Sequence, residues 1–159
     1  MQRGDCVPIR ILCLGNELLA DDAFGIVVAE RISEKTAEGV DVVATMETGF
    51  GLMEYLLNVR HMVVVDTVIT GRAAPGTVHV VCERDVERFP GGSPHYIGLF
   101  EGLELGRKLD LDVPDELVIV AVEGGDCRTV GAPMSQPMYD AIPIVLEQIA
   151  VVLESFTRD

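Results

Sequence analysis

The sequence predicts an α/β fold, in which a parallel sheet carries helices on its faces. Short apolar runs rich in strand-forming residues alternate along the 159-residue chain with segments of helical apolar spacing. Hydrophobic residues make up 48% of the chain and charged residues 24%, a balance typical of a globular protein with a buried core. Because no repeat, low-complexity tract or linker interrupts this pattern, we expect one domain over residues 1–159.

The first strand and helix are expected near the N-terminus. Residues 9–14 (IRILCL) form an apolar run that Gly15 and Asn16 interrupt, and a helical pattern begins near Asp21. The apolar stripe of this helix recurs at three- and four-residue spacing through Phe24, Val27, Val28 and Ile32. This arrangement is typical of a strand, a loop and a helix that packs back onto the sheet.

The remaining strands share short apolar runs, and they are expected over residues 40–44, 61–65, 77–82 and 117–122. The strand over 61–65 is predicted to stop at Asp66. Helices are expected over residues 52–58, 97–109 and 138–156, and loops rich in glycine and proline over 83–96 and 124–133. In the last helix Pro143 predicts a kink, and the buried stripe is expected to hold Met138, Ile142, Val145, Leu146, Ile149, Val152, Leu153 and Phe156.

Composition and charge exclude several classes of protein. The formal net charge of -14 argues against nucleic-acid binding, because phosphate contacts need a basic surface. No apolar run approaches the roughly 20 residues that span a bilayer, and residues 1–8 lack a hydrophobic signal core, so we expect a cytoplasmic protein. The four cysteines, which form no CxxC pair, predict neither a disulfide framework nor a cysteine zinc site: Cys6, Cys13, Cys82 and Cys127.

Polar residues follow the predicted strands, where the carboxyl ends of a parallel sheet bind ligands. They are Asn16, Glu17, Asp21, Asp22, Glu47, Asp66, Glu123 and Asp126. Gathering carboxylates at one edge costs electrostatic repulsion, which a bound cation would relieve. The sequence therefore indicates a candidate cation site at this edge.

Each carboxylate also has a structural explanation. One of Asp21 and Asp22 is expected to cap the first helix, which leaves the other to be explained. Asp66 is equally compatible with a turn and with a site. Glu47 and Glu123 are expected to be solvated loop residues more readily than ligands.

The three histidines differ in their surroundings. His61 opens a predicted strand and His79 lies within one, so both are expected to be structural. His95 instead follows Ser93 and Pro94 in a glycine-rich loop, where a histidine can point into a crevice. Together with Asp22 and Asp66, His95 would supply two oxygens and one imidazole to zinc, nickel or a similar ion. Spacing alone does not establish this site, because the structural explanations together outweigh it.

Familiar catalytic motifs are missing from the chain. After Gly15 the next glycine is Gly25, so the dinucleotide-binding fingerprint is not met, and no Lys-Ser/Thr pair ends a phosphate loop. No GxSxG turn precedes a helix, and no cysteine has a histidine at local spacing. These features count against a generic α/β hydrolase or a nucleotide-binding protein of similar topology.

Five motifs, taken in order, resemble those of the hydrogenase maturation proteases. The family's N-terminal signature resembles ILCLGNELLADDAFGIVVAERI, and its third strand resembles VVVDTV. Its PGT turn resembles APGTVHV, its SPH motif resembles SPHYIGL, and its last helix resembles IPIVLEQIAVVL. Each motif is weak alone, but the ordered set covers nearly the whole chain.

This resemblance implies a three-layer α/β/α sandwich with a twisted, mainly parallel sheet. It implies that Asp22, Asp66 and His95 are the metal-binding and catalytic residues of an aspartic-type endopeptidase. The expected partner is the precursor of a hydrogenase large subunit, whose C-terminal extension is removed after nickel insertion. The nickel is expected to belong to the substrate, and zinc or cadmium to substitute for it in vitro.

The chain departs from the family pattern in two places. METGFG stands where many members have a DGGT-like turn, which makes Glu47 a secondary candidate. EGGDCRTVGAPMS, within residues 123–135, replaces a proline-glutamate motif of some relatives, and this loop is expected to contact the substrate. The alternative from another class is a nickel-binding assembly factor for hydrogenase without proteolytic activity.

Overall fold

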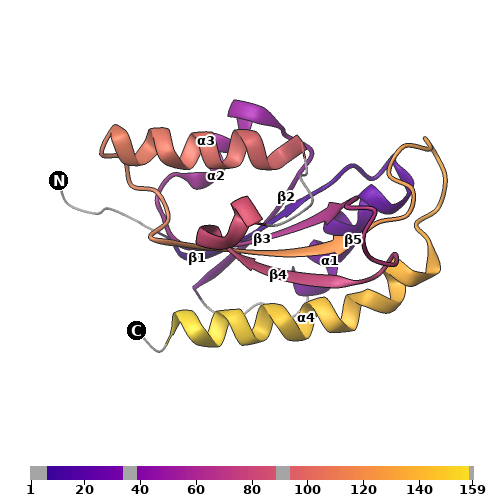
Figure 1. Ribbon diagram of the computed structural model, residues 1–159. Coiled ribbons are helices and arrows are strands. Elements are labelled where there is room, and N and C mark those ends of the chain that lie inside the picture. Colours follow the sequence, from indigo (N-terminus) through magenta and orange to yellow (C-terminus); the bar gives the residue numbers. More distant parts are fainter. Residues whose placement is uncertain (1–6, 34–38, 89–93, 158–159) are drawn as a thin grey trace.

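The structure contains one sheet with the strand order β2-β1-β3-β5-β4 (Figure 1). It is a computed structural model that describes residues 7–33, 39–88 and 94–157. The strands are β1 (Val7–Leu14), β2 (Val40–Thr45), β3 (Val59–Val68), β4 (Val78–Cys82) and β5 (Glu116–Glu123). β1 pairs with β2 and β3 in parallel, β3 pairs with β5 in parallel, and only β4 runs antiparallel to its neighbour. The predicted mainly parallel sheet is confirmed.

Helices cover both faces of this sheet. They are α1 (Phe24–Ser33), α2 (Met53–Leu56), α3 (Pro94–Lys108) and α4 (Gln136–Phe156), with short 3₁₀ segments η1 (Ala20–Ala23), η2 (Gly49–Leu52) and η3 (Glu83–Arg88). α1 and α4 pack on one face, while α2 and α3 pack on the other (Figure 1). The three-layer α/β/α sandwich is therefore confirmed.

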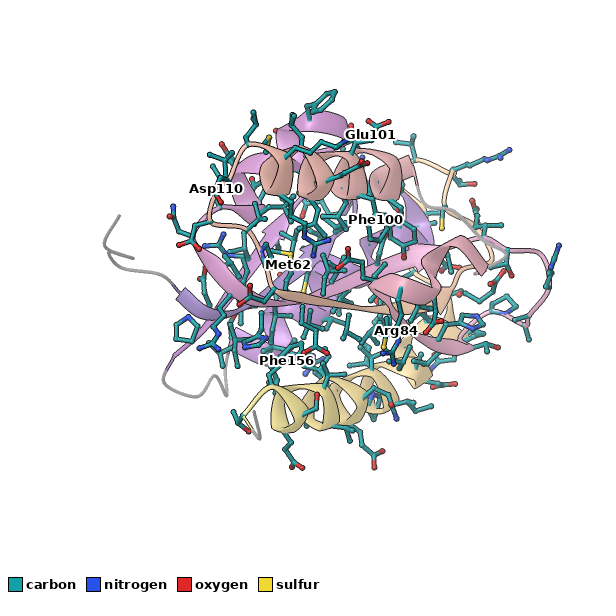
Figure 2. The ribbon with its side chains drawn as sticks, turned by 60° about the vertical axis from the view of Figure 1, so that its left-hand side comes forward. Met62, Arg84, Phe100, Glu101, Asp110 and Phe156 are labelled. Atoms are coloured by element: carbon teal, nitrogen blue, oxygen red, sulfur yellow. The ribbon has the colours of Figure 1, made fainter. Side chains whose placement is uncertain are left out.

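The core is divided by the sheet into two apolar clusters. Successive side chains of a strand point to opposite faces, so Val63 and Val65 of β3 join the α1/α4 cluster. Met62 and Val64 of the same strand join the α2/α3 cluster, and Figure 2 shows Met62 and Phe156 on opposite sides of the sheet. The stripe predicted for the last helix is confirmed: Met138, Ile142, Val145, Ile149, Val152 and Phe156 are buried, and Leu146 and Leu153 are partly buried against the same cluster.

Three predicted boundaries are wrong in ways that concern the site. α3 begins at Pro94 and not at residue 97, because proline suits the first turn of a helix, where its missing N–H is not needed. β3 does not stop at Asp66, because β5 continues to pair with it as far as Val68. The helix expected over 52–58 ends at Leu56, and Asn58 then adopts a left-handed φ of 57° that stops helical structure.

The chain reverses its direction of travel across the sheet between β1 and β3. From β1 it moves outward to β2, and it then crosses back to place β3 on the other side of β1. The crevice at the carboxyl ends of two such strands is where open α/β sheets bind ligands. None of the described helices is long and apolar enough to cross a membrane. The cysteines among the described residues, Cys13, Cys82 and Cys127, are free thiols.

Candidate metal site

The three predicted ligands come together at the switch point of the sheet. One ligand atom from each of Asp22, Asp66 and His95 lies within 4.8 Å of the others. Asp22 is in η1 after β1, Asp66 is in β3, and His95 is in the first turn of α3. Residues up to 73 positions apart in the sequence, from 22 to 95, therefore meet in one group.

Asp66 is held rigidly because it lies within the central strand. It has no exposed surface, and it lies one residue beyond Val65, the last residue of β3 that pairs with β1. The main-chain N–H of Thr67 donates to Asp66 Oδ1 at 2.8 Å. The strand thus delivers a buried carboxylate to the point where its neighbour β1 has already turned away.

The segment that carries Asp22 folds tightly against the end of β1. The N–H of Asn16 donates to the carbonyl oxygen of Asp22 at 3.1 Å. A side chain at Gly15 would approach this same carbonyl oxygen to under 3.0 Å, so only glycine permits the contact. The loop after β1 consequently brings Asp22 back over the edge of the sheet.

His95 is oriented by a main-chain carbonyl. Its Nδ1 lies 3.2 Å from the carbonyl oxygen of Glu47. Because a carbonyl oxygen only accepts hydrogen bonds, this contact assigns the proton to Nδ1 and the lone pair to Nε2. Such an arrangement fixes the tautomer in which an imidazole can bind a metal.

Electrostatics at the site favour a bound cation. Burial raises the pKa of the Asp22 carboxyl, and protonation of His95 would oppose part of this rise. Charged carboxylates are therefore disfavoured in this partly buried position until a cation compensates them. Two carboxylates and one imidazole suit zinc or nickel, and three protein ligands leave coordination positions open for water or substrate.

Asp21 does not cap a helix, contrary to the expectation for one of the two aspartates. The N-terminus of η1 has no side-chain cap, and the Asp21 carboxylate instead accepts N–H groups from Gly125, Asp126 and Ser135. Burial acts to raise the pKa of Asp21, but these donors outweigh it and lower the pKa. The two adjacent aspartates indicated that one of them needs an explanation beyond capping. They could not indicate that Asp21 binds the N–H of Ser135, which is 114 residues away.

Glu123 is also misjudged by the sequence. It was expected to be solvated, yet it is 2% exposed and accepts the N–H and hydroxyl of Thr70 and the N–H of Gly71. The loop after β3 needs an acceptor, and the end of the neighbouring strand β5 supplies it. Glu47 is exposed as expected, and its carboxylate does not belong to the three-residue group. It contributes to the site through its main-chain carbonyl.

Large apolar side chains are exposed on the loops that follow the parallel strands, at the edge of the sheet where the candidate site lies. Phe50 is 64% exposed and Val130 is 73% exposed, and Leu18, Met46 and Ile69 are exposed as well. The Glu47 carbonyl ties the loop of Met46 and Phe50 to His95, and an isolated bridge joins Val130 to the residue after Leu18. We call these five residues the apolar rim.

Sequence comparisons match this chain to one family. A family model described as hydrogenase maturation protease matches residues 26–152, a range that includes Asp66 and His95 but begins after Asp22. The chain is 27% identical over 153 residues to the hydrogenase expression/formation protein HupD of Rhizobium leguminosarum, covering 93% of this chain and 75% of the relative. It is 27% identical over 118 residues to the hydrogenase 2 maturation protease of Escherichia coli, covering 72% and 71%.

Solved structures show the same architecture. The hydrogenase maturating endopeptidase HybD from E. coli superposes with a TM-score of 0.79 at 25% identity, covering 93% of both chains. The [NiFe] hydrogenase maturation protease HybD from Thermococcus kodakarensis superposes with a TM-score of 0.73, covering 91% of this chain and 98% of that one. At 22% identity, the second similarity concerns the fold alone.

Proposed function

This chain belongs to the hydrogenase maturation protease family and is a peptidase, and we propose that it trims the nickel-loaded precursor of a hydrogenase large subunit. In this proposal the enzyme removes a C-terminal extension from the precursor. It recognises the substrate's nickel through Asp22, Asp66 and His95. The metal is thus part of the substrate, and zinc or cadmium would occupy the same ligands in vitro.

The clustering of the three side chains is the observation that carries this proposal. Their ligand atoms lie within 4.8 Å of one another, which is close enough for one ion to contact all three. Asp66 and His95 are buried and Asp22 is half-buried, so Asp22 is the most exposed member of the group. A metal presented on the surface of another protein could complete such an open site.

Proteolysis in this proposal uses the difference between the two aspartates. The nickel, when bound, supplies a Lewis acid beside the scissile carbonyl. Asp22, the more exposed of the two aspartates, accepts a proton from the attacking water and returns it to the leaving amine as the C–N bond breaks. Asp66 and His95, held by Thr67 and by the carbonyl of Glu47, keep the reacting groups in place.

A protein substrate accounts for the apolar rim. Exposed apolar residues in a cluster mark protein contact surfaces, whereas isolated ones need no explanation. Phe50 follows β2 and Val130 follows β5, so a partner that reaches the metal site from outside would meet loops after the carboxyl ends of both strands. We infer that the precursor packs on this rim with its nickel directed toward Asp22.

Processing of a purified precursor tests the proposal. The chain is incubated with nickel-loaded precursor, and mass spectrometry follows the loss of the C-terminal peptide. Asp22→Asn, Asp66→Asn and His95→Gln should each slow cleavage at least about a hundredfold, a typical loss for an acid–base or metal-binding group. Asp115→Asn is the matched control, because this exposed acid precedes β5 at the opposite edge of the sheet.

Two results would contradict the proposal. Cleavage at the parent rate by all three site variants would exclude the assigned residues. A parent chain that binds the precursor's nickel and leaves the precursor mass unchanged would instead support a role in nickel handling during assembly. Asp115→Asn should remain within about twofold of the parent, as expected for a surface change away from the site.

A further inference from the structure

We propose that Asp21 is a positioning residue that joins the loop over residues 124–135 to the metal site. The inference rests on the proposed function, in which Asp22 and Asp66 are metal ligands: Asp21 would position these ligands and the loop together. Asp21 would not touch the metal or the substrate itself. It would act by holding Asp22, Asp66 and the loop in one arrangement.

The carboxylate of Asp21 holds both ends of the loop. Its Oδ2 accepts the N–H of Gly125 at 2.8 Å and that of Asp126 at 3.1 Å, at the start of the loop. Its Oδ1 accepts the N–H of Ser135 at 2.7 Å, directly before α4. A single side chain that is 1% exposed therefore closes a loop of about ten residues against the sheet edge.

The main chain of Asp21 continues this network toward the ligands. Its N–H donates to the carbonyl of Asp126 at 2.8 Å, and its own carbonyl accepts the Thr67 hydroxyl at 3.2 Å. The N–H of Thr67 in turn donates to Asp66 Oδ1 at 2.8 Å. One path of hydrogen bonds thus runs from the loop through Asp21 and Thr67 to Asp66, while Asp22 is the next residue in the chain.

Backbone conformation indicates that these bonds hold a strained segment. Ala20, directly before Asp21, has a φ of 42°, in the left-handed region that residues with a side chain rarely adopt. Strain of this kind persists only where surrounding contacts determine the conformation. The side-chain and main-chain bonds of Asp21 are such contacts. Removing them would let η1 relax and would move Asp22 away from the group.

Replacing the carboxylate by an amide tests this inference. In Asp21→Asn only the side-chain oxygen can accept a hydrogen bond. The NH₂ group that replaces the other oxygen must then face a main-chain N–H at one end of the loop, where two donors repel each other. Asp126→Asn is the matched control: it removes the same charge from the loop that Asp21 holds, and its retained oxygen can still accept from Arg128 and Thr129.

Limited proteolysis measures the loop without reference to activity. Arg128 is exposed within the loop, so release by trypsin of the C-terminal fragment that begins at Thr129 reports opening of the loop. We expect Asp21→Asn to accelerate this cleavage at least about tenfold, and Asp126→Asn to stay within about twofold of the parent. Asp21→Asn should also raise KM for the precursor, through the loop, and lower kcat, through the ligands.

Binding of Cd²⁺ by calorimetry measures the effect on the ligands. Asp21→Asn should weaken Cd²⁺ binding by about tenfold to a hundredfold, the usual effect of losing a group that orients a ligand. Thr67→Val removes only the hydroxyl bond to Asp21, so it should weaken Cd²⁺ binding and leave trypsin cleavage after Arg128 unchanged. This second variant keeps the inference testable if Asp21→Asn does not fold.

The two proposals fail in different ways. Parent-like cleavage after Arg128 and parent-like Cd²⁺ affinity in Asp21→Asn would overturn the role of Asp21, as would parent-like Cd²⁺ affinity in Thr67→Val. If the parent chain leaves the precursor uncut, the proposed function fails. The proteolysis and Cd²⁺ measurements would then still decide the role of Asp21.

Discussion

The contact between α3 and the η2 segment provides a sharp test of how His95 is placed. A side-chain carbon at Gly98 of α3 would lie under 3.0 Å from three main-chain atoms of Gly49. At Gly102, one turn further along the same helix, the nearest atom would be a terminal methyl of Leu56 at 3.2 Å. Gly98→Ala and Gly102→Ala are therefore the same substitution in the same helix with different neighbours.

The two substitutions differ in the cost of relieving the contact. Replacing glycine by alanine inside a helix stabilises the folded chain by about 1 kcal/mol at both positions, because alanine has the higher helix propensity. At Gly98 two main chains must separate by about 1 Å, and this overpacking costs ~3 kcal/mol because neither side can rotate away. Gly98→Ala should therefore destabilise by about 2 kcal/mol and lower Tm by about 4–8 °C. Gly102→Ala should stabilise the folded chain by between about 0 and 1 kcal/mol, because the methyl of Leu56 can shift and leave part of the helix-propensity gain.

Denaturant unfolding of both variants provides the measurement, with equal m values as the check that unfolding is comparable. Gly98→Ala should also weaken Cd²⁺ binding, because α3 carries His95 and the loop before Gly49 carries the carbonyl of Glu47 that orients it. A Gly98→Ala variant as stable as the parent, or equal losses in both variants, would refute the close approach of α3 and η2.

Two further predictions concern the rim and a cysteine. Phe50→Ser and Val130→Ser should raise KM for the precursor about tenfold or more. Both side chains are exposed, so kcat and thermal stability should remain nearly unchanged. An unchanged KM in steady-state assays would exclude the apolar rim as the docking surface. Burial, followed by the charges of Asp22 and other nearby aspartates, raises the pKa of the Cys127 thiol from 9.0 to about 12. Thiolate at neutral pH is then about a thousandfold scarcer, so alkylation by iodoacetamide should be far slower in the folded than in the urea-unfolded chain, and equal rates would contradict this environment.

Local sequence pattern is enough to predict much of the fold of this protein. Strand and helix periods depend on neighbours within one or two turns, so the strands, the stripe of α4 and the α/β class could be predicted from spacing. The convergence of Asp22 and Asp66 followed from a general property of parallel sheets, whose carboxyl ends meet at one edge. His95 was identified for a different reason, its place beside glycines and a proline, and the structure assigns it to the first turn of α3 instead of the loop.

Tertiary structure decided the groups whose partners are far away in the chain. The sequence predicts a helix cap at one of Asp21 and Asp22 and a solvated acid at Glu123. The N–H groups that the Asp21 and Glu123 carboxylates accept are too far away in the sequence for a local pattern to include them. The need for a glycine at position 98 comes from the close approach of Gly49, which belongs to a distant segment of the chain. Burial and hydrogen bonding depend on distance in space, and that distance is set only when the sheet brings its loops to one edge.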